Sequence, residues 1–250
     1  FNLIEIPGDI FCNIDFAFHA AWLYVVGSIV YIAYSFFVWD QVYSDYTDDS
    51  LNPGIYTNTL GSIIFIFNAI CCLFDWWAQR NQLSLSCIDV EKGFDLDSGL
   101  QLTQTPYIQS MLYFWNNIFF LAAAMVFFIQ SIWYEDPETD VHNCDTRYWC
   151  TFWINFWGNF LYFVSSVFSI LEFRTNVKSR QELELPPLYL FTCDWEWFDW
   201  FGWGDVLFFV AGVLAVSQTL LNSFVAQTNE DTFNCCFTLL INTVFLVDSL

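Results

Sequence analysis

The segment FAFHAAWLYVVGSIVYIAYSFFVW, residues 16–39, contains no Asp, Glu, Lys or Arg. An apolar run of this length crosses the roughly 30 Å hydrocarbon layer of a bilayer as an α-helix. Five further apolar stretches follow it, at residues 55–77, 111–134, 151–173, 201–225 and 233–250, of which the last is the shortest. We therefore expect an all-α, polytopic integral membrane protein with about six transmembrane helices.

The composition favours a membrane location. The mean hydropathy is +0.44, with 56% hydrophobic and only 13% charged residues, outside the usual range of soluble domains. Residues 16–250 are expected to form one membrane domain, with residues 1–15 as an N-terminal segment at the inner face. Asp and Glu number 27 against 6 Lys and Arg, a net charge of -21. This charge excludes nucleic acid as a partner, and we expect it to repel anionic lipid headgroups too.

The charges of the loops predict the orientation. Basic residues in short loops face the cytoplasm-equivalent side of a membrane. The connections after the second and fourth spans contain five of them: Arg80, Lys92, Arg174, Lys178 and Arg180. The loops of the other side, at 40–54, 135–150 and 226–232, contain eleven acids and only Arg147. We predict that both termini lie at the inner face and that the outer face is strongly acidic. The inner loop at 78–110 should be irregular or contain a short interfacial helix.

Pairs of small residues recur in the middle of five spans. They are Gly27-Ser28, Gly61-Ser62, Ala123-Ala124, Ser165-Ser166 and Ala211-Gly212. Tyr31, Phe65 and Phe127 follow three of these pairs by four positions, and Asn117, Asn159 and Asp205 precede the later pairs by six. Such self-similarity indicates duplication of a helical hairpin, although apolar helices can also be aligned on Gly or Ser by chance. Small residues at mid-span let neighbouring helices approach closely.

Two of these segments resemble a known family. They read Trp22-Leu-Tyr-Val-Val-Gly-Ser-Ile-Val-Tyr31 and Trp157-Gly-Asn-Phe-Leu-Tyr-Phe-Val-Ser-Ser-Val-Phe168. The pattern is similar to the YrhK-like small membrane domain, whose helices contain an Asn or Gly followed by Phe-x-x-Gly-Ser-x-x-Phe. The resemblance covers most of the chain as up to three tandem two-helix units, with Gly-Ser replaced by Ala-Ala, Ser-Ser or Ala-Gly in several copies. It implies a helical-hairpin fold and no activity.

The acidic outer loop at 135–150 contains two cysteines. Cys144 and Cys150 lie on the face predicted to be non-cytoplasmic, where an oxidising compartment would allow a disulfide bridge between them. The acids of this loop lack the spacing of a calcium-binding loop, so we interpret it as a solvated segment. Adjacent cysteines elsewhere point in different directions on a helix, and we predict no metal site.

Polar residues inside spans mark candidate functional sites in membrane proteins. Those that qualify by position are Asn68, Gln130, Asn155, Asn159, Glu172, Asp205 and Gln218. With Asn117 from the repeat, we select four as a possible intramembrane polar site: Asn117, Asn159, Glu172 and Asp205. The two acids could belong to a proton or cation path, or could cap helix ends and reach the headgroups. No nucleotide-binding or hydrolase motif is found, and two His residues are too few for haem. We predict no catalytic residue and no cofactor. Bound lipids are expected, and the binding of pigments is left as an open alternative.

These features lead to two hypotheses of different class. The first is a non-catalytic structural or accessory subunit that packs against lipid and other membrane-protein subunits. The second is a cation channel or transporter, in which the acidic outer loops concentrate cations and Asn117, Asn159 and Asp205 line a common path. The two differ in whether these side chains face one hydrated axis or separate helix contacts. A lipid-modifying enzyme would need clustered acids or His near the interface, which the sequence does not offer.

Overall fold

The computed structural model describes residues 16–43, 53–93, 104–135, 144–182, 199–222 and 230–249. Its side chains are described over 16–37, 56–78, 108–132, 152–178, 199–200, 202–221 and 236–248. The N-terminal segment 1–15 and most of the acidic loops lie outside these ranges. The expectations about those segments therefore stay predictions.

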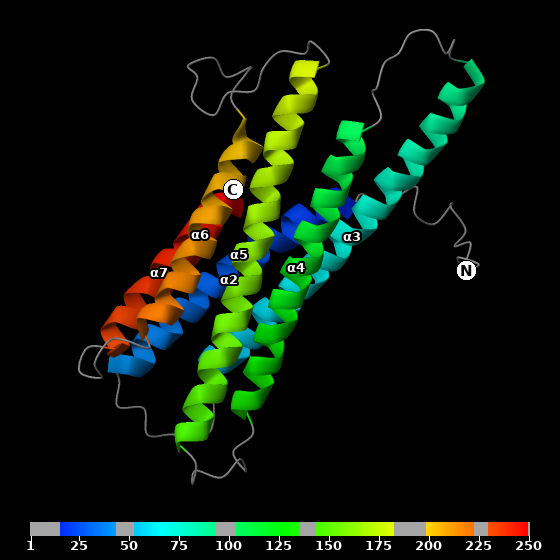
Figure 1. The fold of residues 1–250 in the computed structure, drawn as a ribbon. Helices are drawn as coiled ribbons and strands as arrows, with labels where there is room; N and C mark the ends of the chain where they lie inside the picture. The colour runs from blue at the N-terminus through cyan, green and yellow to red at the C-terminus, as the bar shows by residue number, and fades with distance from the viewer. Residues whose placement is uncertain are drawn as a thin grey trace.

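Six helices make up the described part of the chain. They are α2 (Phe16–Tyr43), α3 (Pro53–Gly93), α4 (Gln104–Glu135), α5 (Cys144–Glu182), α6 (Trp200–Asn222) and α7 (Glu230–Ser249). The helices run side by side in alternating directions, as Figure 1 shows. Asp199 directly precedes α6, where an aspartate commonly caps a helix, and its carbonyl accepts a hydrogen bond from the Trp203 amide at 3.2 Å. The all-α prediction is confirmed.

Five of these helices are long and apolar enough to cross a membrane. Their spans are Phe16–Phe37, Tyr56–Ala78, Ile108–Ile132, Phe152–Lys178 and Gly202–Leu221. The sixth helix, α7, has a shorter apolar part at Cys236–Asp248. This result confirms a multi-pass membrane protein and agrees with the expectation that the sixth apolar stretch is the shortest.

Three helices, α3, α4 and α5, extend well beyond the predicted spans. The segment 78–110 was expected to be irregular or to contain a short interfacial helix; instead α3 itself continues to Gly93, and α4 already begins at Gln104. Residues 78–92 are polar yet contain no Gly or Pro, so nothing in their local sequence stops the helix. Gly93 then ends it, and Pro106 is tolerated in the first turn of α4. Hydropathy detects the membrane-spanning part of a helix and not its polar continuation.

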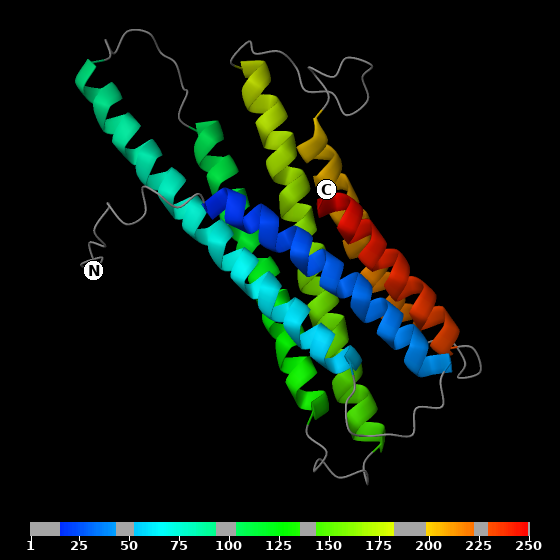
Figure 2. The same ribbon diagram turned by 180° about the vertical axis from the view of Figure 1, so that it is seen from behind.

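The six helices close into a ring. Within the described residues, each helix packs against its neighbours along the chain, and α2 also packs against α7. Figure 2 shows these two helices, blue and red, side by side on the rear face of the bundle. We call α2–α3, α4–α5 and α6–α7 hairpins, and we call the contacts between successive hairpins, α3–α4, α5–α6 and α7–α2, seams.

The centre of the ring is filled by aromatic side chains. Every helix contributes at least one: Tyr24 and Tyr31 from α2, Phe65 from α3, Phe120 and Phe127 from α4, Tyr162 from α5, Phe208 from α6 and Phe245 from α7. The ring of Phe120 lies between 5.2 and 6.1 Å, centroid to centroid, from rings of α2, α3, α5 and α6. These are ordinary distances for packed aromatic pairs. The axis of the bundle is therefore occupied by side chains across this layer.

Candidate functional site

The small pairs found in the sequence all lie at helix contacts. All ten residues of these pairs are buried, and Ser28, Ser62, Ala123, Ala124, Ser165, Ser166 and Ala211 have no exposed surface. The expectation that small residues allow close approach of the helices is therefore met by the packing. Duplication of a hairpin unit is a separate claim about ancestry and stays a prediction.

Glycine and aromatic residues interlock inside the first hairpin. A Cβ atom added to Gly27 would lie 2.6 Å from the ring of Phe65, and one added to Gly61 would lie 2.8 Å from the ring of Tyr31. The two rings stack on each other at 5.3 Å with an interplanar angle of 15°. Each ring thus occupies the space above the glycine of the facing helix, and no larger residue fits there without movement.

The second hairpin repeats this contact in one direction. A Cβ on Gly158 would lie 2.8 Å from the ring of Phe127, and Phe127 stacks on Tyr162 at 5.6 Å and 21°. The residue that stands four positions before Phe127 is Ala123, which is fully buried. In α5 the aromatic residue of this contact, Tyr162, therefore follows Gly158 by four positions. Gly158 lies about two helical turns before the Ser165-Ser166 pair, which the sequence alignment had placed at the equivalent position.

Hydroxyl and carboxyl groups meet across the seams at one end of the ring. The Tyr24 hydroxyl of α2 donates to Asp248 of α7 at 2.5 Å, and the Ser169 hydroxyl of α5 donates to Asp205 of α6. A longer contact of 3.4 Å runs from the Tyr113 hydroxyl of α4 to Asp75 of α3. The hydrogen bonds described within hairpins involve hydroxyl and amide groups instead, such as Tyr31 with Ser62 at 2.9 Å and Gln130 with Asn155 at 2.9 Å.

The two predicted asparagines lie at different places. Asn117 is buried and donates to the carbonyl of Tyr113 in its own helix at 2.9 Å. Asn159 crosses the seam between α5 and α6 and donates to the hydroxyl of Thr219 at 2.8 Å. Neither amide is grouped with Asp205, although the sequence alignment made the three positions equivalent.

The two predicted acids lie on neighbouring helices, and neither caps a helix. Asp205 is in the second turn of α6 and accepts a hydrogen bond from Ser169 of α5. Glu172 follows Ser169 by three positions, about one helical turn further along α5. The alternative that they cap helix ends is wrong, because α5 continues to Glu182 and α6 begins at Trp200. The seam between α5 and α6 thus brings two carboxyl groups into the membrane-spanning part of the bundle.

The sequence analysis missed the contacts that close the ring. Asp248 accepts a hydrogen bond from the Tyr24 hydroxyl. Asn242 donates to the Tyr31 carbonyl at 3.0 Å and to the Ser35 hydroxyl at 2.7 Å. The available signal was that each is a polar residue in the otherwise apolar last stretch. Their partners are more than 200 residues away in the chain, so periodicity could not identify them.

One buried hydroxyl has no hydrogen-bond partner within the described residues. Tyr162 is 6% exposed, and its hydroxyl oxygen is buried without a donor or acceptor nearby. The ring packs against Phe120 at 5.2 Å and Phe245 at 6.0 Å. Its aromatic part therefore stabilises the core, while its hydroxyl loses the hydration that it would have in water.

The predicted disulfide lies where side chains are not described. Cys144 and Cys150 are both in the first turns of α5, and the backbone is helical across them. Residues at this separation on a helix have Cα atoms about 10 Å apart. A disulfide requires about 4.4–6.8 Å. The helical backbone therefore argues against the predicted bridge. Among the described residues, no group of three or more His, Cys, Asp or Glu side chains is arranged to hold a metal ion.

No protein-family model, curated protein or solved structure matches this chain. The resemblance to the YrhK-like membrane domain therefore stays a prediction. The function is therefore inferred from the packing of the six helices.

Proposed function

We propose that this chain is a non-catalytic structural or accessory subunit of a larger membrane assembly. The observation that carries the proposal is the aromatic core, in which each of the six helices contributes a ring to the bundle axis. A conducting pathway needs polar groups or water along that axis. The packed rings of Phe and Tyr fill this layer of the axis, so it suits a scaffold better than a pore.

The polar side chains within the spans support the same proposal. Asn159 and Asn117 use their amide groups in contacts with α6 and with the backbone of α4, respectively. Asn68 of α3, which is 5% exposed, donates to the Ala20 carbonyl of α2 at 2.6 Å. Hydrogen bonds between helices contribute to association in a bilayer, where burial of apolar surface gives no advantage over lipid. Asn159 and Asn68 thus link neighbouring helices, whereas the amide of Asn117 is satisfied within α4.

The outward faces are rich in large apolar residues. Phe18, Trp22, Trp157 and Trp200, from three different helices, are between 51% and 64% exposed. Such surface has to be covered by lipid or by the helices of other proteins. This requirement is compatible with a subunit that has partners on more than one side.

The test is extraction of the native protein in a gentle detergent, followed by sizing and by mass spectrometry of the proteins that co-purify. Recovery in a large complex with a constant set of partners is the expected result, and those partners would name the biological process. Recovery as a monomer or a small homo-oligomer from several detergents would contradict the proposal.

A cation or proton transporter is the alternative, and one observation favours it. The carboxyl groups of Asp75, Glu172, Asp205 and Asp248 come from four helices and all lie toward the same end of the alternating bundle. Acids within spans commonly mark ion pathways. Flux measured in proteoliposomes distinguishes the two functions, because a transporter would give cation-dependent flux that Asp205→Asn reduces, whereas a scaffold would give none.

A further inference from the structure

The last helix of the bundle is the one least suited to cross a membrane by itself. The other five have apolar spans of 20 to 27 residues, whereas the apolar part of α7, Cys236–Asp248, rises only about 18 Å. The hydrocarbon layer is roughly 30 Å thick. In the sequence, the acids Glu230 and Asp231 begin the helix and Asp248 stands near its other end. A segment of this length and composition inserts poorly as an independent span.

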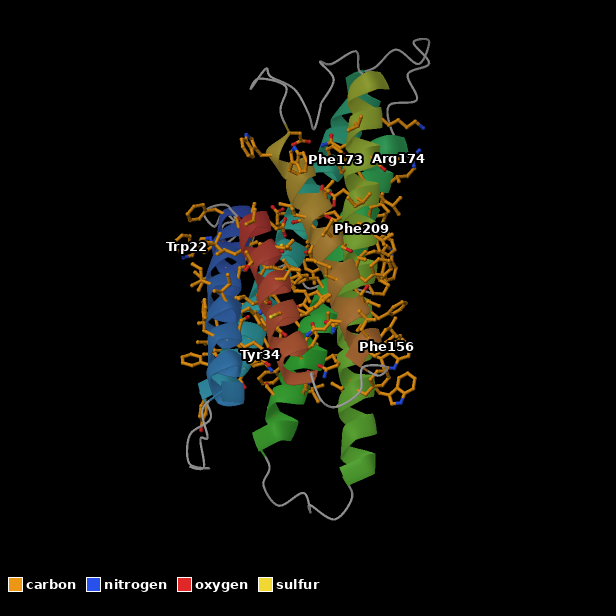
Figure 3. The ribbon with its side chains drawn as sticks, turned by 90° about the vertical axis from the view of Figure 1, so that its left-hand side faces the viewer. Trp22, Tyr34, Phe156, Phe173, Arg174 and Phe209 are labelled. Carbon is orange, nitrogen blue, oxygen red and sulfur yellow. The ribbon has the colours of Figure 1, made fainter. Side chains whose placement is uncertain are left out.

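Polar side chains of α7 have partners on both neighbouring helices. Asp248 accepts a hydrogen bond from the Tyr24 hydroxyl of α2 at 2.5 Å. Thr238 accepts one from the Gln218 amide of α6 at 3.1 Å. Figure 3 shows α7, drawn in red, between α2 and α6. Because the lipid interior offers no hydrogen-bond partner to such groups, the two helices supply what the bilayer cannot.

The face of α2 that receives α7 is continuous. Asn242 of α7 is 7% exposed and donates to the Tyr31 carbonyl at 3.0 Å and to the Ser35 hydroxyl at 2.7 Å. Tyr24, Tyr31 and Ser35 are separated by seven and four positions, so they lie on one face of α2. The amide and the carboxyl group of α7 are thus both held by this face.

The receiving helix does not need α7 in order to span the membrane. Residues 16–37 of α2 contain no Asp, Glu, Lys or Arg and form one of the five spans that are apolar enough by themselves. Synthesis runs from the N-terminus, so α2 precedes α7 by some 200 residues. The receiving face is therefore present in the membrane before α7 is made.

We propose that α7 is a conditional transmembrane helix, which crosses the bilayer only when it is docked between α6 and α2. Insertion of α7 and closure of the ring are then a single event, in which α7 acts as the strap that closes the bundle. When the contacts with α2 are lost, α7 lies at the membrane surface, and its end stays on the side where the helix begins. This inference rests on the membrane location and not on the proposed subunit function.

The test places one epitope tag before Phe1 and a second after Leu250, and protease protection in sealed vesicles shows whether the tags lie on the same side. Six alternating helices that all cross place the tags on one side, as expected for the wild type, and five place them on opposite sides. Tyr24→Phe with Ser35→Ala changes only α2 and leaves the composition of α7 intact. Because this double variant loses two hydrogen bonds between helices, the ratio of opposite-side to same-side chains should rise about tenfold.

A control and a rescue separate docking from general destabilisation. Ser62→Ala removes a hydroxyl partner at the contact of α2 with α3 and should not change the ratio, because α3 is apolar enough to span without α2. Adding Asn242→Leu and Asp248→Leu to the double variant should return both tags to one side, because an apolar α7 needs no polar partner. An unchanged ratio in the double variant, whatever its stability, would overturn the proposal. So would an equal rise in Ser62→Ala, a failed rescue, or opposite tags in the wild type.

Discussion

The hairpins and the seams hold similar apolar helices together by different means. In the hairpins α2–α3 and α4–α5, aromatic rings lie directly over glycines, at Gly27, Gly61 and Gly158. At the seams, hydroxyl groups donate to carboxyl groups, as Tyr24 does to Asp248, and amides also cross, as Asn159 does to Thr219. Gly212 of α6 also lies close to Ser166 and Phe163 of α5 at one seam. The hairpin contact depends on shape and tolerates no extra atom. The seam contact depends on one donor and one acceptor and tolerates changes that preserve them.

The difference follows from the physics of the bilayer. Lipid is as apolar as the helix surface, so helices associate through close packing or through polar bonds between them. The connections at 44–52, 94–103 and 136–143 are of similar length, so chain entropy does not separate the α3–α4 seam from these two hairpins. Helices from successive hairpins gain from a polar bond that specifies the neighbour. In this ring the hydroxyl–carboxyl pairs supply that specification.

The largest effect is expected from filling the space above a hairpin glycine. Gly61→Leu would place a Cβ 2.8 Å from the ring of Tyr31 and should destabilise the bundle by about 3 kcal/mol, because the stacked rings cannot yield without losing contact. Unfolding in detergent micelles measures this change. Ala21→Leu, at an exposed position of α2, places the same side chain on the outer surface and should have little effect. Equal stability of the two variants would contradict the role given to the glycine.

The next effect concerns the seam that closes the ring. Tyr24→Phe removes the donor to Asp248 and keeps the ring that packs against Phe65, so it should cost about 2 kcal/mol, because a buried carboxyl group loses its hydrogen-bond donor. Unfolding in micelles again gives the value. A cross-link between cysteines introduced in α2 and α7 would report whether this seam opens first. An unchanged stability would mean that packing alone closes the ring.

A smaller effect is expected from a hydroxyl pair inside a hairpin. Ser62→Ala removes the partner of the Tyr31 hydroxyl, a neutral hydrogen bond of 2.9 Å, and should cost about 1 kcal/mol. Comparison with Tyr24→Phe under the same conditions sharpens the contrast between hairpin and seam. A cost larger than that of Tyr24→Phe would show that the two kinds of contact do not differ as described.

The smallest effect has the opposite sign. Tyr162→Phe removes a buried hydroxyl that has no hydrogen-bond partner within the described residues and leaves the ring contacts with Phe120 and Phe127 in place. The free energy of unfolding should stay the same or rise by up to about 1 kcal/mol, because no desolvated polar group remains. A loss of stability would indicate that this hydroxyl binds a group such as an internal water molecule, and a high-resolution density map would locate it.

Several features of the candidate site were accessible from the sequence because they depend on local properties. The pairs Gly27-Ser28 and Ser165-Ser166 are buried at helix contacts, as small residues in mid-span predict. Glu172 and Asp205 were recognised as acids within or near spans. The Ser169 partner of Asp205 could not be predicted, because residues on different helices are brought together only by the antiparallel register of α5 and α6.

Other features were predicted wrongly for identifiable reasons. The alignment of small residues made Asn117, Asn159 and Asp205 equivalent, yet their partners are a backbone carbonyl, a threonine and a serine in different places. One-dimensional alignment ignores the direction in which each side chain points. The bridge between Cys144 and Cys150 was inferred from compartment and loop position, and the helical backbone that begins at Cys144 does not suit it.

The sequence by itself determined that this is an all-α membrane protein, because an apolar segment of some twenty residues satisfies its backbone hydrogen bonds in lipid only as a helix. It also determined where the helices approach closely, since small residues leave that space. Only the tertiary structure decided that the six helices close into a ring with an aromatic centre. The reason is that α2 meets α7 through Tyr24, Asp248 and Asn242, and such distant pairings depend on the packing of every helix between them.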